Sequence, residues 1–317
     1  MNKESVMLSP FATEVINGLT GTNKQLPSKY FYDAKGDELF QKIMHLDEYY
    51  LTRKELEIFE SQKSSILESI YDGDPFRIIE LGAGDGLKTK ILLKYFIDQG
   101  VDFTYSPVDI SGNVLEILSD GLKNDVPGLK IDPYEGDYFD ALEAVSDRPE
   151  KDVVFFLGSN VGNFPQEEAR GFLKKLRSFL GDDDLLFMGV DLKKDPDVIL
   201  AAYNDSKGVT REFNLNLLDR INNELDADFD KAKFKHYPYY NPHTGECRSY
   251  LISTEAQDVH VAGEKIHFHA WESIFMEVSK KYDERQLQKL SGKTGFEPLT
   301  AFYDNQQWFA DVLWKCD

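Results

Sequence analysis

The segment from Ile78 to Gly86 constrains the fold of this chain more than any other part of the sequence. It reads IIELGAGDG, a short apolar run followed directly by a glycine-rich turn. Glycines allow the backbone to approach a ligand in conformations that a Cβ would forbid, and the helix expected over 88–96 begins with free N–H groups. A strand, a glycine turn and a helix in this order are typical of a nucleotide-cofactor site in an open α/β sheet.

Acidic residues around the turn restrict the kind of cofactor. Glu80 precedes the glycines, Asp85 lies among them, and Asp109 ends a second expected strand, where its carboxylate can accept hydrogen bonds from two ribose hydroxyls. A pyrophosphate would be repelled by this loop, whereas a sulfonium cofactor carries no pyrophosphate. By itself a GxGxG turn also occurs as a simple tight turn.

The segment 136–139, with the sequence GDYF, adds a polar and an aromatic side chain suited to an adenine edge and face. Together with the acidic glycine loop, it resembles the site of S-adenosylmethionine (SAM) methyltransferases more than that of nicotinamide dehydrogenases. We therefore predict SAM as the cofactor. The predicted cofactor-binding residues are Gly82, Gly84, Lys88, Asp109, Asp137 and Tyr138.

The order of apolar runs predicts the fold class. Expected strands alternate with helical segments, which indicates a doubly wound parallel sheet; the strands are 77–81, 103–108, 129–131, 153–157 and 185–190. Two further runs, 299–303 and 308–313, flank a polar turn and predict a terminal β-hairpin. The predicted class is α/β, a Rossmann-like SAM-methyltransferase sheet with a terminal β-hairpin, plus a second α+β substrate-binding domain.

The second domain is expected where the pattern changes, between about residues 195 and 282. A helix with one apolar side, around 213–225, is followed by strand-like runs at 248–254, 259–262 and 274–278, too much material for a single crossover. Residues 28–71 read as largely helical, and the N-terminal helices up to residue 58 are expected to join it. We predict a SAM-binding core of 59–195 and 283–317, and a substrate-binding domain of 1–58 and 196–282.

Composition excludes several classes of partner. The 317 residues carry a formal net charge of -20, which repels phosphate backbones and anionic membranes, so we expect neither nucleic acid nor membrane as a partner. The two cysteines, Cys247 and Cys316, lie far apart in sequence, and no histidine has metal-ligand spacing, so no metal site is predicted. No uncharged apolar run approaches the ~20 residues of a membrane helix. We expect a cytoplasmic monomer.

Motifs along nearly the whole chain resemble one family, the SAM-dependent histidine Nα-methyltransferases of ergothioneine biosynthesis. The matching segments are 30–36, 48–53, 80–84, 156–163, 208–214, 222–229 and 276–282. The resemblance implies transfer of methyl groups from SAM to the α-amino nitrogen of free L-histidine, three times, giving hercynine. A small-molecule amino acid is then the expected substrate.

Asn163 follows the fourth expected strand, at the edge where open α/β sheets bind ligands. Its amide can orient an amine, although Gly162-Asn163 is also a common turn dipeptide. The resemblance implies that Asn163 contacts the substrate amine, and that Tyr32, Tyr49 and Tyr203 hold the amine and the carboxylate of the amino acid. We predict Asn163 and Tyr32 as the catalytic residues.

Glu277 and Ser279 are two residues apart in a strand-like run, so they share a face that Met276 and Val278 do not. One carboxylate and one hydroxyl can serve both nitrogens of an imidazole, but a solvated sheet face shows the same alternation. The resemblance implies that this pair binds the imidazole. The predicted substrate-binding residues are Tyr49, Asn163, Tyr203, Glu277 and Ser279.

The sequence departs from the family pattern at a few positions. Asp47 and Leu51 stand where proline is frequent, Ser249 where methionine is frequent, and Met276 where threonine is commoner. If Ser249 and Met276 line the pocket, its shape differs. Two alternatives therefore stay open: methylation of another aromatic amino acid, which an apolar residue at 277 would favour, and a non-catalytic SAM-binding protein, which a degraded cofactor loop would favour.

Overall fold

The computed structural model describes residues 9–145 and 150–317, and the chain divides into two compact units. Unit 1 comprises Met1–Tyr50 and Lys194–Ser279, and unit 2 comprises Leu51–Lys193 and Lys280–Asp317. The boundary expected between 58 and 59 would cut helix α3 (Leu51–Ile70), which is continuous and belongs entirely to unit 2. The chain also changes unit after Lys193 and after Ser279. These positions come two and three residues, respectively, before those expected from the sequence.

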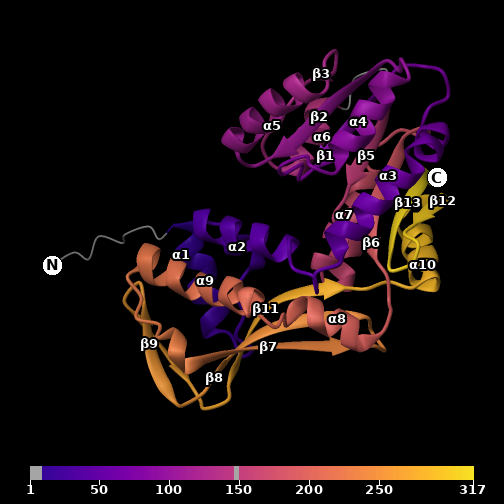
Figure 1. Cartoon of the computed structure of the whole chain (residues 1–317). Helices are drawn as coiled ribbons and strands as arrows, with labels where there is room; N and C mark the ends of the chain where they lie inside the picture. The colour runs from indigo at the N-terminus through magenta and orange to yellow at the C-terminus, as the bar shows by residue number, and fades with distance from the viewer. Residues whose placement is uncertain (1–8, 146–149) are drawn as a thin grey trace. The chain divides into compact units, whose positions relative to one another are not determined.

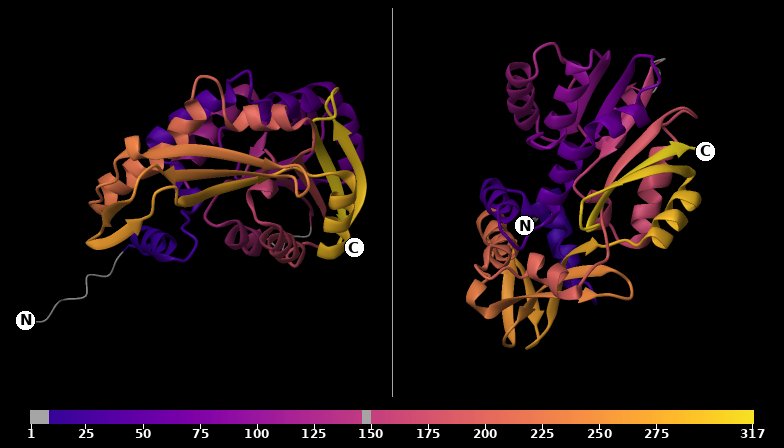
Figure 2. Two further views of the ribbon diagram at one scale, coloured as in Figure 1. Left: turned by 90° about the horizontal axis from the view of Figure 1, so that it is seen from below. Right: turned by 45° about the vertical axis from the view of Figure 1, so that its right-hand side comes forward.

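Unit 2 is built on an eight-stranded sheet in the order β12-β13-β6-β5-β1-β2-β3, with β4 paired to β2. Its strands are β1 (Phe76–Leu81), β2 (Phe103–Asp109), β3 (Lys130–Ile131), β4 (Tyr134–Glu135), β5 (Lys151–Phe156), β6 (Leu185–Asp191), β12 (Phe296–Tyr303) and β13 (Phe309–Cys316). β1, β2, β5 and β6 run parallel, whereas β13 is antiparallel to both β6 and β12. The predicted Rossmann-like sheet and terminal hairpin are confirmed, and the hairpin is drawn in yellow beside β6 (Figure 1, Figure 2).

Helices cover both faces of this sheet. They are α3, α4 (Thr89–Asp98), α5 (Gly112–Asp125), α6 (Tyr138–Val145), α7 (Gln166–Arg177) and α10 (Glu284–Thr294). Buried residues of α6, α7 and α10 form one apolar cluster with Leu186 and Met188 of β6. Phe187 lies between these two and therefore points to the opposite face, where its ring stacks on Phe59 of α3 at 6.0 Å between centroids. The sheet is thus enclosed between two helical layers.

Unit 1 joins helices to two small sheets. Its elements are α1 (Pro10–Thr20), η1 (Ser28–Phe31), α2 (Ala34–Met44), α8 (Pro196–Tyr203), α9 (Val209–Leu225), η3 (Lys231–Lys233), β7 (Phe234–Asn241), β8 (Glu246–Ser253), β9 (Gln257–Val261), β10 (Glu264–Phe268) and β11 (Ser273–Lys280). The long strands lie in the order β11-β8-β7, and β9 pairs with β10. Figure 1 labels β7, β8, β9 and β11. The predicted second α+β region is present, and β7 and β10 are strands that the sequence analysis missed.

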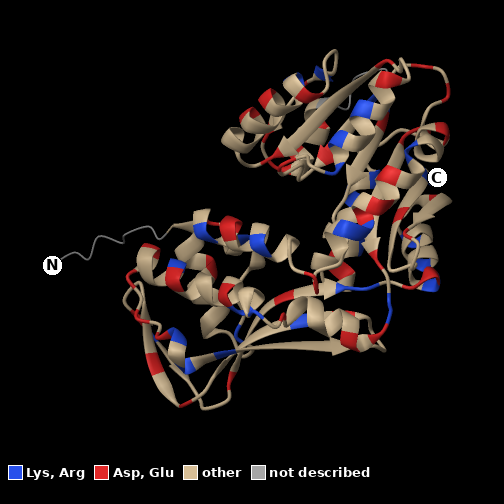
Figure 3. Ribbon diagram, viewed as in Figure 1, with Lys and Arg blue, Asp and Glu red and all other residues tan. Residues whose placement is uncertain are grey.

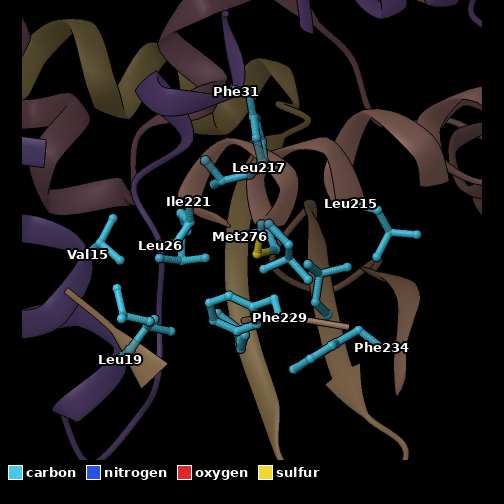
Figure 4. Packing of buried hydrophobic residues seen from close by; sticks show 14 of the residues in the cluster. Val15, Leu19, Leu26, Phe31, Leu215, Leu217, Ile221, Phe229, Phe234 and Met276 are labelled. Carbon is cyan, nitrogen blue, oxygen red and sulfur yellow. The ribbon is translucent and has the colours of Figure 1, made fainter. Parts of the chain in front are cut away.

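The core of unit 1 lies between the helices and these strands. Figure 4 shows side chains of α1, α9 and β11 converging on one apolar cluster, among them Val15, Ile221 and Met276. Met276 is only 1% exposed. It therefore points into the core and does not share the face of β11 that carries Glu277, so the departure at this position does not reshape that face directly.

Candidate active site

The glycine turn after β1 has an open side where a ligand can approach. Its glycines Gly82, Gly84 and Gly86 have φ values of 73°, 54° and 63°, which favour residues without a Cβ. The amide of Gly82 donates to the Val108 carbonyl at 2.9 Å, fastening the turn to the end of β2. A Cβ on Gly82 would lie 2.7 Å from the Tyr138 hydroxyl, whereas a Cβ on Gly84 would meet nothing within 4 Å. The turn is therefore open at Gly84 and closed at Gly82.

Glu80 stabilises the turn through buried hydrogen bonds. Its carboxylate is buried and accepts hydrogen bonds from the Tyr105 hydroxyl of β2 at 2.6 Å and from the Thr89 hydroxyl of α4 at 2.7 Å. Burial raises the pKa of Glu80 to about 7, although both hydrogen bonds act in the opposite direction. Glu80 thus ties together the strand and the helix that flank the turn.

Asp109, Asp137 and Tyr138 lie at the same edge of the sheet as the turn. The half-buried Asp109 ends β2 and accepts the Ser111 amide at 3.0 Å, while its carbonyl accepts the Gly136 amide, also at 3.0 Å. The Asp137 carboxylate accepts the amide two residues later at 2.9 Å and so holds the start of α6. Burial raises the pKa of Tyr138 to about 12, so its hydroxyl stays protonated at neutral pH. The group offers two carboxylates, a hydroxyl and a ring at this edge, and the hydroxyl of Tyr138 lies next to Gly82.

Lys88 is engaged within the protein. Its ammonium contacts the Glu55 carboxylate of α3, and the other oxygen of Glu55 accepts the Gly158 amide at 2.7 Å. The Lys88 side chain is nevertheless 23% exposed to solvent. A role in cofactor binding remains a prediction, and the ion pair with Glu55 is a feature that sequence reasoning missed.

Asn163 ends a short 3₁₀ turn, η2 (Asn160–Asn163), that follows β5, and it is exposed. Ser159 precedes the turn at a φ of 60°, and its hydroxyl accepts the Asp191 amide at 3.0 Å. A Cβ on Gly162 would lie 2.8 Å from the Lys280 carbonyl, so only glycine fits there. Close packing on both sides therefore fixes the turn that presents the Asn163 amide.

Glu277 and Ser279 lie on one face of β11, and each meets a polar side chain from another element. The Ser249 hydroxyl of β8 donates to Glu277 Oε1 at 3.3 Å. The hydroxyls of Tyr203, at the end of α8, and Ser279 lie 2.7 Å apart. The structure thus groups three of the predicted substrate residues, and it adds Ser249 as a direct partner of Glu277.

Tyr32 and Tyr49 gather around Phe40 of α2. Their ring centroids lie 5.6 Å and 6.4 Å from that of Phe40, and Tyr32 is 48% exposed. The Glu48 carboxylate accepts the Ser206 hydroxyl at 2.7 Å, which links the turn before Tyr49 to the segment that follows Tyr203. These contacts and the Tyr203–Ser279 pair connect the segments that carry the predicted site residues of unit 1. Those residues are Tyr32, Tyr49, Tyr203, Glu277 and Ser279.

The neighbouring Tyr50 has a different environment from Tyr49. It is 2% exposed, its hydroxyl accepts the Lys194 ammonium at 2.9 Å, and the same ammonium lies 4.3 Å from its ring centroid. Tyr49 is half-buried.

Two further features bear on function. Among residues 9–145 and 150–317, no group of three His, Cys, Asp or Glu side chains is arranged to hold a metal ion. In the same ranges, no helix combines the length and the apolar character needed to cross a bilayer.

The comparisons with known proteins identify the family. The sequence profile of the histidine-specific, SAM-dependent methyltransferases matches residues 11–316. A histidine N-alpha-methyltransferase of Mycolicibacterium smegmatis is 36% identical over 85% of this chain and 83% of its own, and one of Mycobacterium tuberculosis is 34% identical over 94% and 90%. The ergothioneine biosynthesis protein 1 of Neurospora crassa is 31% identical over 89% of this chain and 32% of its own. The chain belongs to the histidine-specific, SAM-dependent methyltransferase family.

Proposed function

We propose that this protein transfers methyl groups from SAM to the α-amino nitrogen of free L-histidine, three times, and so produces hercynine for ergothioneine biosynthesis. The observation that carries the proposal is the pair formed by Glu277 and Ser279 on one face of β11, each held by a second polar side chain, in a chain of this family. A carboxylate and a hydroxyl two residues apart match the two nitrogens of an imidazole.

In this proposal the imidazole is recognised by hydrogen bonds of opposite sense. The Glu277 carboxylate accepts one ring N–H, and the Ser279 hydroxyl serves the other nitrogen. The Ser249 hydroxyl restricts the orientation of the Glu277 carboxylate, and the Tyr203 hydroxyl restricts that of Ser279. A prepositioned pair loses less conformational freedom on binding than two free side chains would.

Tyr32, Tyr49 and Tyr203 are proposed to hold the amine and carboxylate of histidine, and Asn163 to orient the amine. The environment of Tyr50 supports the choice of Tyr49, because the hydroxyl and ring of Tyr50 already serve Lys194. The exposure of Tyr32 and Asn163 leaves both side chains accessible to a ligand.

When bound, SAM supplies an electrophilic methyl group on a sulfonium. The protein must then present a neutral amine lone pair in line with that methyl group and shielded from water. Because an α-amine is largely protonated near neutral pH, it must lose a proton before each transfer. We propose that the Tyr32 hydroxyl passes this proton to solvent, while the Asn163 amide keeps the lone pair aligned.

Two substitutions test this assignment together. Glu277→Ala should raise the KM for histidine by about ten- to a hundredfold and leave that for SAM nearly unchanged, since it removes a charged hydrogen-bond partner of the imidazole alone. Asp109→Ala should do the reverse, since it removes a partner of the ribose. Steady-state kinetics with each ligand varied in turn would reject the assignment if either variant lost affinity equally for both ligands.

We further propose that the protein acts in the cytoplasm as a monomer, on a small-molecule amino acid and without nucleic acid or membrane. Acidic side chains occur on the helices and loops of both units, in keeping with the net charge of -20 (Figure 3). Such a field disfavours polyanionic partners.

A further inference from the structure

Three titratable side chains meet inside unit 2: Glu55 of α3, Lys88 at the start of α4 and Asp311 of β13. The Glu55 and Asp311 side chains are almost fully buried. Gly189 of β6 pairs with Asp311 across the sheet, and a Cβ there would clash with the Glu55 carboxylate and lie 3.2 Å from Asp311 Oδ1. The glycine thus leaves the space in which the two carboxyl groups face each other.

Asp311 is the unusual member of this cluster. Counted over the described residues, neither of its oxygens has a conventional hydrogen-bond partner. Burial raises the pKa of Asp311 well above its usual range, and the adjacent Glu55 carboxylate adds to the rise while Lys88 opposes it. A raised pKa favours the protonated form of the carboxyl group, and in that form it can donate a hydrogen bond to Glu55.

Two donors contact the Glu55 carboxylate, the Lys88 ammonium and the Gly158 amide at 2.7 Å. The Asp311 carboxyl faces the same carboxylate across Gly189 and is a third donor in its protonated form. The charged groups facing Asp311 are Glu55 from α3 and Lys88 from α4. On the neighbouring strands the paired residues are Gly189 and Phe302, neither of which titrates.

We propose that Glu55, backed by the Asp311 carboxyl, is a positioning residue that fixes both the Lys88 ammonium and the Gly158 amide beside the cofactor loop. The Lys88 side chain follows the glycine turn, and Gly158 begins the segment that leads to Asn163. The buried Glu55 carboxylate thereby fixes the positions of two segments on which methyl transfer depends. The inference rests on the proposed cofactor role of Lys88.

The test is the dissociation constant for SAM, measured by titration calorimetry on the full chain without any amino acid substrate. Glu55→Gln should weaken SAM binding about tenfold, because Lys88 loses its fixed counter-charge. Asp311→Leu should weaken it in the same direction, and Asp311→Asn, which keeps a neutral donor, should recover most of the loss.

Asp152→Asn is the matched control. Asp152 on β5 is also buried and forms an ion pair with Arg77 on β1, with both hydrogen bonds at 2.9 Å, but it lies at the amino end of these strands. Its substitution should lower the melting temperature and leave the SAM dissociation constant unchanged. An equal loss of SAM affinity in Asp152→Asn and Glu55→Gln would overturn the positioning role in favour of a general effect of buried charge.

Two further measurements separate the parts of the inference. If Lys88→Met binds SAM normally, the cofactor role of Lys88 is wrong; if it binds poorly while Glu55→Gln binds normally, only the positioning role is wrong. The infrared difference spectrum between the unchanged protein and Asp311→Asn at neutral pH should show the C=O band of one protonated carboxyl. With both proteins folded, its absence would mean that Asp311 is ionised and would overturn the arrangement.

Discussion

Ser249 illustrates how a single departure from the family pattern acts on the candidate site. It is buried, and its hydroxyl donates to the Glu277 carboxylate at 3.3 Å. Ser249→Ala should raise the KM for histidine about fivefold without changing that for SAM, because the carboxylate loses one restraint. Ser253→Ala on the same strand is the control, since the Ser253 hydroxyl donates to the Glu255 carbonyl instead. A histidine KM unchanged by Ser249→Ala would show that this contact does not order Glu277.

At residue scale, Glu80 also makes stability depend on pH. Its pKa rises from 4.5 to about 7 on folding because the group is buried, so the folded protein retains a proton that the unfolded chain releases. The contribution of Glu80 to the free energy of unfolding is fully present below about pH 4 and is lost as the pH rises through 7. The change is on the order of 3 kcal/mol. Glu80→Gln should flatten this part of the profile of unfolding free energy against pH, measured by denaturant unfolding. A profile as steep as that of the unchanged protein would contradict the assignment.

Among the helices, α10 offers a separable test of local structure. The Asp283 carboxylate accepts the Gln286 amide at 2.9 Å, and the Gln286 side chain accepts the Asp283 amide at 3.1 Å, which together form a capping box. Asp283 also pairs with Lys193 at 2.9 Å. Asp283→Ala should lower the free energy of unfolding by about 1 kcal/mol, whereas Asp283→Asn should retain most of the cap and lose only the charge. Equal losses in the two variants would assign the stability to the ion pair.

At the scale of elements, the sequence predicts strands with continuous apolar runs well and mixed strands poorly. β1 and β6 are buried at every position and were predicted within two residues of their bounds. β7 was missed because it mixes lysine, histidine and aromatic residues and contains Pro238. Its burial nevertheless alternates along the strand, and its place at the edge of the β11-β8-β7 sheet tolerates a proline.

The same limit applies to the site. Alternation along one strand places Glu277 and Ser279 on a common face, as predicted. The contacts of Ser249 and Tyr203 with that pair depend on pairing between distant segments, which no local period encodes. Glu55 offered a local signal, because it is an acidic residue on the helix face that also carries the apolar Leu51 and Ile58. Its partners Lys88 and Asp311 are distant in the chain and could not be predicted from the sequence.

For the whole molecule, each unit is assembled from two separate stretches of chain. Within unit 2 the two stretches are fastened close to where they leave it: Leu192 bridges Tyr282, and the fully buried Lys281 and Asp191 form an ion pair at 2.7 Å. Removing one partner of such a pair would leave a buried charge without its counter-charge. This pairing joins residues some 90 positions apart in the chain, and no local pattern in the sequence encodes it.

The central claim concerns the reaction of the whole protein and is tested most directly by its products. The purified chain would be incubated with SAM and an equal mixture of free amino acids, and the products identified by mass spectrometry. The account predicts Nα-trimethylated histidine as the sole accumulating product. Methylation of a different amino acid, or binding of SAM without any methylated histidine, would contradict it.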